Sequence, residues 1–190
     1  MRLILASASP RRSDLLARIG VEVAAIDPAE IDETPLPNEK PADYARRIAA
    51  AKAAIVAPRH PGAVILAADT VVAAGRRILP KATDAAEVRA CMTLLAGRRH
   101  HVLSAVTVVD AAGVARHRLS DSIVAFGPLT EKVIQAYADS GEGVGKAGGY
   151  AIQGRAEAFV RYLSGSHSGV VGLPLFETRA LLGSAGISVG

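Results

Sequence analysis

A run of β-forming residues from Val64 to Val72 is the feature that most limits what this chain can fold into. The run is almost continuously apolar, which is typical of a central strand with both faces covered. Asp69 interrupts it. Because a carboxylate is unfavourable in a strand and costly to bury, Asp69 must be paired, bound to a metal, or placed at the open end of the strand. Asp69 is therefore the first candidate functional residue, and a purely structural pairing with a buried arginine or a backbone turn is the alternative.

The remaining periodicity predicts strands and helices that alternate in an α/β fold. Arg2 to Ser7 reads as a buried strand, and the Ser9-Pro10 pair then starts a helix that ends at Gly20. Two β-runs flank a turn at 110–113 and predict a hairpin, so the sheet should be mixed. Other strands are expected at 21–26 and 159–163. Helices are expected from the capping pair of Asp84 and Glu87 up to Gly97, and at 130–140 and 174–182.

One further helix is expected after the acidic, proline-bearing loop at 28–41. Its predicted apolar stripe is Tyr44, Ile48, Ala51 and Ile55, with Lys52 flanking the stripe. No repeat or linker divides the chain. We therefore expect one domain over 1–190, with a mixed, twisted sheet flanked by helices around a central cleft.

Composition narrows the class of protein. The chain has 190 residues and a formal charge of +4, and Cys91 is its one cysteine. A single thiol cannot form an intramolecular disulfide, which favours a reducing compartment, so we expect a cytoplasmic protein. No apolar run approaches the roughly 20 residues of a membrane span, and the N-terminus leads directly into a strand, so neither a membrane partner nor a signal peptide is expected.

The charge and the aromatic content bear on the kind of ligand that the protein binds. Aromatic residues make up 4% of the chain and tryptophan is absent. A surface that stacks bases would therefore have few side chains to use, which argues against nucleic acid as a partner. A modest positive charge suits a small anion as well as it suits nucleic acid, and the positions of the basic residues decide between them.

The predicted strand-to-helix turn at 6–12 has the chemistry of a phosphate site. It combines the hydroxyls of Ser7 and Ser9 with unpaired helix-start amides and the guanidinium groups of Arg11 and Arg12. Arginine in a first helical turn opposes the helix dipole, so a bound anion would explain it. The alternative is that Ser9 and Pro10 only begin a helix and the arginines are solvated. Neither standard glycine-rich nucleotide motif is present.

Other candidates are individually weak. Glu33 belongs to an acidic loop, Lys52 and Lys81 lie on either side of Asp69 in the sequence, and Gln153 ends a glycine-rich segment where backbone can approach a ligand. His100 and His101 start a strand and point to opposite faces, so they cannot form a metal site through adjacency. A serine-histidine-aspartate site lacks its usual elbow motif.

Several segments, in order along nearly the whole chain, resemble the Maf family of nucleoside triphosphate pyrophosphatases. They are Leu5-Ala6-Ser7-Ala8-Ser9-Pro10-Arg11-Arg12, Ala68-Asp69-Thr70-Val71-Val72, Pro80-Lys81, Leu95-Ala96-Gly97, Lys146-Ala147-Gly148-Gly149-Tyr150-Ala151-Ile152-Gln153-Gly154 and Val171-Gly172-Leu173-Pro174-Leu175.

The resemblance implies a Maf/ITPase-like fold and hydrolysis of a nucleoside triphosphate to the monophosphate and pyrophosphate. It implies a divalent cation, Mg²⁺ or Mn²⁺, as cofactor. By position, Asp69 resembles the family's catalytic acid-base residue and, with Glu33, its metal ligands. Seven residues of this chain resemble the family's substrate-binding and specificity positions: Ser7, Arg11, Arg12, Lys52, Thr70, Lys81 and Gln153. A homodimer is compatible with the resemblance.

The glycine-rich segment resembles the branch of the family that prefers dTTP and UTP. That branch commonly has a tryptophan just before the Lys-Ala-Gly segment, and this chain has none. A broad-specificity or 7-methyl-GTP pyrophosphatase is therefore an alternative. A non-catalytic nucleotide- or nucleic-acid-binding regulator of cell division is another, and Asp69 argues against it, because a pure anion site gains nothing from a carboxylate.

The expected cations around Asp69 create a chemical difficulty. Positive neighbours lower the pKa of a carboxylate, which weakens it as a general base near pH 7. A metal held by Asp69 and Glu33 would acidify its bound water, so that Asp69 need only accept a proton from an activated water.

Overall fold

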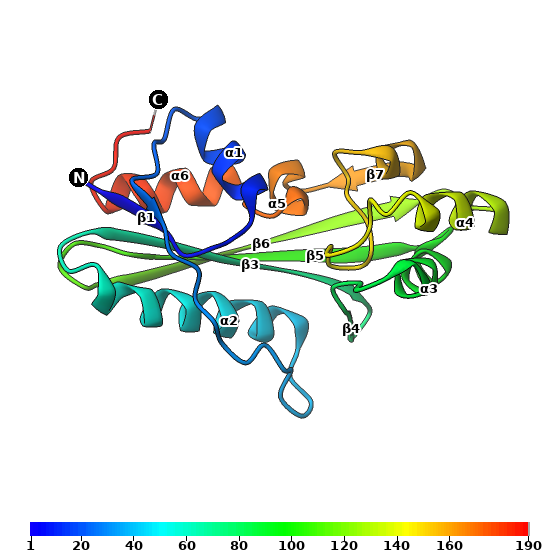
Figure 1. Cartoon of the computed structure of the whole chain (residues 1–190), viewed down its shortest axis with the longest axis horizontal. Coiled ribbons are helices and arrows are strands. Elements are labelled where there is room, and N and C mark those ends of the chain that lie inside the picture. Colours follow the sequence, from blue (N-terminus) through cyan, green and yellow to red (C-terminus); the bar gives the residue numbers. More distant parts are fainter. Residues whose placement is uncertain (190) are drawn as a thin grey trace.

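The computed structural model describes residues 1–189 and shows one mixed, open sheet with helices on both faces (Figure 1). Within those residues the strands are β1 (Leu3–Leu5), β2 (Ala25–Ile26), β3 (Val64–Ala74), β4 (Arg77–Leu79), β5 (Arg99–Val109), β6 (Ala115–Phe126) and β7 (Val160–Ser164). The α-helices are α1 (Pro10–Arg18), α2 (Pro41–Val56), α3 (Ala85–Leu95), α4 (Glu131–Asp139), α5 (His167–Val171) and α6 (Leu175–Ser184). Two 3₁₀ turns are Ala57–Arg59 and Arg155–Phe159.

The strand order is β2-β1-β3-β5-β6-β7, and β4 pairs with β3 beyond the end of β1. β1 is parallel to β2 and β3, whereas the pairs of β3 with β5, β5 with β6, and β6 with β7 are antiparallel. Helix α2 covers one face, and α1, α5 and α6 cover the other (Figure 1). The predicted mixed α/β fold and the hairpin at 110–113 are confirmed, with β3 as the central strand.

Helix α2 differs from the predicted stripe. Its buried side chains include Tyr44, Ile48, Lys52 and Val56, while Ile55 is 38% exposed. The prediction was wrong for Ile55, and Lys52 belongs to the buried face instead of flanking it. Three alanines share that face and let the helix pack closely on β3 and β5. A lysine can lie there because its ammonium group finds carboxylates beneath the helix.

Smaller differences concern helix starts and short elements. Ser9 precedes α1 as predicted, but its side chain makes no capping hydrogen bond. Asp84 does cap α3, because its Oδ1 accepts from the amide of Glu87. The predicted strand at 21–26 is reduced to β2, and neither β4 nor α5 was anticipated. No helix within residues 1–189 has the length and apolar character needed to cross a membrane.

His100 and His101 lie on opposite faces of the sheet, as predicted. His101 pairs with Asp121 at the surface, whereas His100 is 1% exposed and its Nε2 lies 2.8 Å from Tyr150 Oη. Burial, with a smaller contribution from His101, lowers the pKa of His100 to about 4, so its imidazole is neutral near pH 7. This contact ties the glycine-rich segment to the sheet.

Candidate active site

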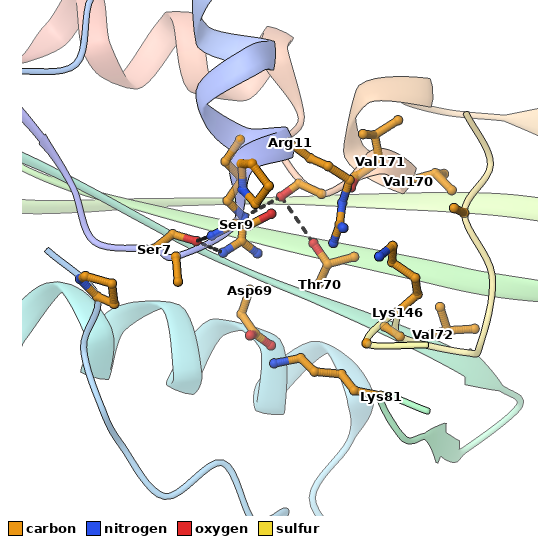
Figure 2. Close-up of a pocket in the computed structure, with 18 of the residues that line it drawn as sticks. Ser7, Ser9, Arg11, Asp69, Thr70, Val72, Lys81, Lys146, Val170 and Val171 are labelled. Atoms are coloured by element: carbon orange, nitrogen blue, oxygen red, sulfur yellow. Dashed lines mark hydrogen bonds between the residues drawn. The ribbon is translucent and has the colours of Figure 1, made fainter. Parts of the chain in front are cut away.

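The nine residues that the family resemblance assigned to the site all line one pocket of about 410 Å³. The pocket lies between the β1–α1 turn, the middle of β3, the glycine-rich segment at 145–153 and the end of α5 (Figure 2). A volume of this size is typical of sites that hold small molecules such as nucleotides. The nine are Ser7, Arg11, Arg12, Glu33, Lys52, Asp69, Thr70, Lys81 and Gln153.

The β1–α1 turn forms one wall of the pocket around Ser7. Ser7 Oγ accepts from the amide of Ser9 at 3.2 Å and from Nη1 of Arg12 at 2.8 Å. Arg12 Nε also donates to the carbonyl of Gly172 at 2.9 Å. Burial lowers the pKa of Arg12, although Asp69 acts to raise it. A buried guanidinium held at two points is preorganised to bind a phosphate group.

Asp69 lies in the middle of β3 and is 2% exposed. Its Oδ1 accepts from Lys52 Nζ at 3.0 Å. Burial raises the pKa of Asp69, even though Lys52, Arg12 and Lys81 all act to lower it. The neighbouring cations thus act as expected, but the expected net lowering of this pKa was wrong, because desolvation of the carboxylate outweighs them. A carboxylate with a raised pKa is a better proton acceptor than the sequence alone suggested.

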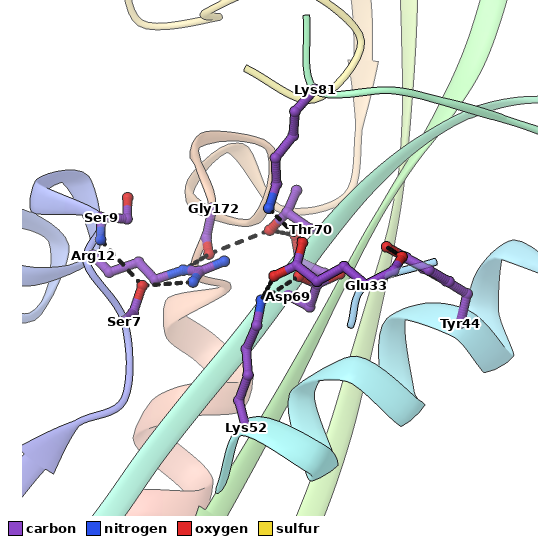
Figure 3. Close-up of polar contacts among 11 residues, drawn as sticks. Ser7, Ser9, Arg12, Glu33, Tyr44, Lys52, Asp69, Thr70, Lys81 and Gly172 are labelled. Carbon is purple, nitrogen blue, oxygen red and sulfur yellow. Dashed lines mark hydrogen bonds and ion pairs between the residues drawn. The ribbon is translucent and has the colours of Figure 1, made fainter. Parts of the chain in front are cut away.

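Glu33 joins two lysines that come from opposite sides of the pocket (Figure 3). Its Oε1 lies 2.7 Å from Lys52 Nζ, and its Oε2 lies 2.7 Å from Lys81 Nζ. Burial acts to raise the pKa of Glu33, but its bonds to the two ammonium groups lower it to about 2. The acidic loop is anchored by Tyr44, whose hydroxyl donates to the carbonyl of Glu33 at 2.7 Å. Glu33 is thus ionised and fixed beside Asp69.

Thr70 is occupied by contacts that the sequence did not reveal. Its Oγ1 lies 2.8 Å from Ser104 Oγ and donates to the carbonyl of Gly172 at 3.3 Å. Ser104 is fully buried on β5 and donates to the carbonyl of Gly169 at 2.6 Å. The carbonyl of Gly172 therefore accepts hydrogen bonds from both Thr70 and Arg12. These contacts link β3, β5 and α5 to the pocket wall that the β1–α1 turn forms. Sequence reasoning did not predict these contacts of Ser104 and Gly172, or the bond from Tyr44 to the Glu33 carbonyl, because each joins residues that are distant in the sequence.

The glycine-rich segment closes the pocket on the side opposite α2. Gly148 and Gly149 have φ of 66° and 68°, and a Cβ at Gly148 would lie 2.7 Å from Val72. Glycine is required there because any side chain would meet β3. The segment presents Gln153, which is exposed, and Lys146, which faces Arg11 across the pocket (Figure 2). Burial, followed by the charge of Arg11, lowers the pKa of Lys146.

Glu33 and Asp69 supply the carboxylate oxygens of the pocket. Within residues 1–189, no group of three or more His, Cys, Asp or Glu side chains is arranged to hold a metal ion. Mg²⁺ is usually held by one or two carboxylates together with waters and substrate phosphates. Two carboxylates that share Lys52 as a partner therefore fit a cation that binds with the substrate, and they do not fit a closed protein-only metal site.

Comparison with known proteins identifies the family. Residues 2–185 match the family described as Maf-like protein. A dTTP/UTP pyrophosphatase of Sphingopyxis alaskensis is 63% identical, over 99% of this chain and 98% of that protein. A dTTP/UTP pyrophosphatase of Rhodospirillum rubrum is 59% identical, over 99% of this chain and 90% of that protein.

Among solved structures, a nucleoside-triphosphatase, described as a dITP/XTP pyrophosphatase, from Mycobacterium abscessus matches at 22% identity. It covers 68% of this chain and 76% of its own, with a TM-score of 0.42. The assignment to a family depends instead on the match along 2–185 and on the closely similar relatives. This chain belongs to the Maf family.

Proposed function

We propose that the protein hydrolyses dTTP and UTP to the monophosphate and pyrophosphate with the help of a divalent cation. The observation that carries the proposal is the buried carboxylate of Asp69 in a pocket that also contains Arg12, Lys52 and Lys81. A site that only bound an anion would be weakened by this carboxylate, whereas a hydrolytic site needs a proton acceptor. Relatives named dTTP/UTP pyrophosphatase support the choice of substrate.

The cationic side chains would bind the triphosphate and stabilise the charge that develops on the leaving group. Water attacks the α-phosphorus and forms a new P–O bond, and the bond to the bridging oxygen of pyrophosphate breaks. Asp69 accepts the proton that the water loses. Arg12, Lys52 and Lys81 then neutralise the negative charge that moves onto pyrophosphate.

Glu33 and Asp69 would hold Mg²⁺ or Mn²⁺ together with the substrate phosphates. A bound divalent cation supplies positive charge to the phosphates and lowers the pKa of a coordinated water. Lys52 contacts both carboxylates. A cation held by the same carboxylates would therefore bind beside the Lys52 ammonium group. The proposal also includes a reducing, cytoplasmic location, for which the buried free thiol of Cys91 is the support. A homodimer stays a prediction.

Removal of the divalent cation is expected to stop turnover. With Mg²⁺ or Mn²⁺ present, pyrophosphate should be released from dTTP and UTP, and excess EDTA should abolish release, because the phosphates would keep their mutual repulsion. Pyrophosphate and orthophosphate should be measured separately. As the control, Mg²⁺ or Mn²⁺ added in excess of EDTA should restore release. Turnover that continues undiminished in EDTA would contradict the role given to Glu33 and Asp69 as metal ligands.

Gln153 is expected to contribute to base selectivity. Thymine and uracil each present an N3–H donor beside an O4 acceptor, and a carboxamide can match both in one plane. Gln153→Ala should therefore reduce the preference in kcat/KM for dTTP and UTP over CTP, ATP and GTP by about tenfold, with a smaller effect on the highest rate. Gln135→Ala, on the exposed face of α4, is a matched control. Equal kcat/KM for all five nucleotides in the unmutated protein would contradict the assignment and indicate broad specificity.

A further inference from the structure

A second pocket, of about 270 Å³, lies at the end of the sheet where β5 starts and β6 ends. Within the described part of the chain, residues 1–189, it shares no lining residue with the candidate active site. Its lining includes Arg98, Arg99, Ala125, Arg161 and Tyr162, and among residues 1–189 no acidic residue contributes to it. The pocket therefore combines three arginines with Tyr162, a residue that is 46% exposed.

The register of the sheet builds the centre of this pocket. Arg99 pairs with Ala125 across β5 and β6, and Ala125 pairs with Tyr162 across β6 and β7. The three side chains therefore lie in a row on one face, and the small methyl group of Ala125 leaves space between the larger two. The guanidinium carbon of Arg99 is 5.1 Å from the centroid of the Tyr162 ring. This cation–π contact orients Arg99 and reduces the entropy that it would lose on binding a ligand.

A β-bulge adds the third guanidinium group. The register between β6 and β7 shifts, so that Tyr162 faces Ala125 while Val160 faces Phe126, and Arg161 is the extra residue. Neighbouring residues in a regular strand point to opposite faces, yet Arg161 and Tyr162 both line the pocket. Bulges commonly redirect a side chain in this way. The irregular pairing thus directs a positive charge into a pocket that already contains two.

Charge and geometry together point to the ligand. Within residues 1–189, none of Arg98, Arg99 and Arg161 forms an ion pair, whereas Arg89 and Arg116 each contact a carboxylate. Guanidinium groups gathered in one small pocket repel each other, and an anion bound between them would offset that repulsion. Arginine forks match the oxygens of phosphate, and the small volume suits one or two phosphate groups.

We propose that this pocket is a second anion site that binds a phosphate group, either of free phosphate or pyrophosphate or of a nucleic-acid backbone. The site is independent of the proposed hydrolysis, because none of its residues takes part in the candidate active site. Tyr162 offers a ring face beside the phosphate if the ligand also carries a base.

The test is a titration of the ¹⁵N-labelled protein with pyrophosphate, and separately with a single-stranded oligonucleotide, followed by amide NMR. Saturating shifts are expected at Arg99, Ala125 and Tyr162, in addition to shifts in the active-site pocket. The double variant Arg99→Ala/Arg161→Ala should weaken binding at this pocket by about tenfold for each guanidinium removed and leave active-site shifts unchanged. Arg118→Ala is the matched control, because it removes an exposed arginine from the neighbouring strand β6.

The two arms identify the source of the phosphate. Saturation by pyrophosphate supports a free anion, and saturation only by the oligonucleotide supports a nucleic-acid backbone. The proposal is overturned if both titrations shift active-site amides alone. It is also overturned if the shifts at this pocket persist in the double variant, or if Arg118→Ala weakens them equally.

Discussion

The Asp69→Asn protein is expected to lose turnover by about 10³-fold or more while it still binds nucleotide. The amide keeps the shape of the side chain but has no charge and no basic oxygen with which to accept a proton. Arg12, Lys52 and Lys81 remain available to the phosphates, so the Kd for dTTP or UTP should change much less than kcat. Turnover is measured as pyrophosphate release, and Kd by calorimetry with a non-hydrolysable analogue.

Asp121→Asn is a suitable control for this variant. Asp121 is an exposed carboxylate on β6 that pairs with His101, outside the pocket. Its removal should leave kcat and Kd unchanged. If Asp69→Asn retained kcat within about threefold of the unmutated protein, another group would have to be the proton acceptor.

Lys52→Ala is expected to lower stability and activity together, whereas Lys81→Ala should lower activity alone. Lys52 is 7% exposed and lies between two carboxylates, so its loss leaves Asp69 buried without its partner. Breaking a buried ion pair in this way typically costs about 3 kcal/mol or more, which corresponds to a fall in Tm of about 10 °C for a domain of this size. The Lys81 side chain is 54% exposed, and solvent screening limits its contribution to stability to about 1 kcal/mol or less.

Thermal unfolding of both variants, with kcat and KM for dTTP, separates these effects. The double variant Lys52→Ala/Asp69→Asn is the control, because it removes the unpaired charge and should recover part of the stability lost in Lys52→Ala. Equal Tm values for the two lysine variants would show that the contact between Lys52 and Asp69 does not stabilise the fold. An active Lys81→Ala protein with unchanged KM would remove Lys81 from the phosphate site.

Much of the fold and the candidate site could be predicted because the chain carries local patterns. The apolar run around Asp69 predicted a central strand, and β3 occupies that position. The turn with Ser7 and Arg12 followed from a strand that leads into a helix start. The gathering of nine side chains in one pocket followed from the family resemblance, since their spacing along the chain does not place them together.

The features that sequence reasoning missed depend on tertiary packing. Periodicity assigned Ile55 to the buried face of α2 and Lys52 to its edge, because it counts apolar residues and cannot detect carboxylates beneath a helix. Nothing in the sequence distinguishes Ser104 from other serines in strands. Its contact forms only in the fold, where its hydroxyl donates to the carbonyl of Gly169 on α5. The raised pKa of Asp69 likewise depends on how deeply β3 is covered, which neighbouring charges alone do not reveal.

The central claim is that this pocket cleaves a nucleoside triphosphate between the α and β phosphates. The most direct measurement is ³¹P NMR of UTP incubated with the protein and Mg²⁺, with Asp69→Asn as the blank. The account predicts that UMP and pyrophosphate appear together in equal amounts from the first spectrum, with no UDP at any time. Accumulation of UDP with orthophosphate, or an unchanged UTP spectrum, would contradict it.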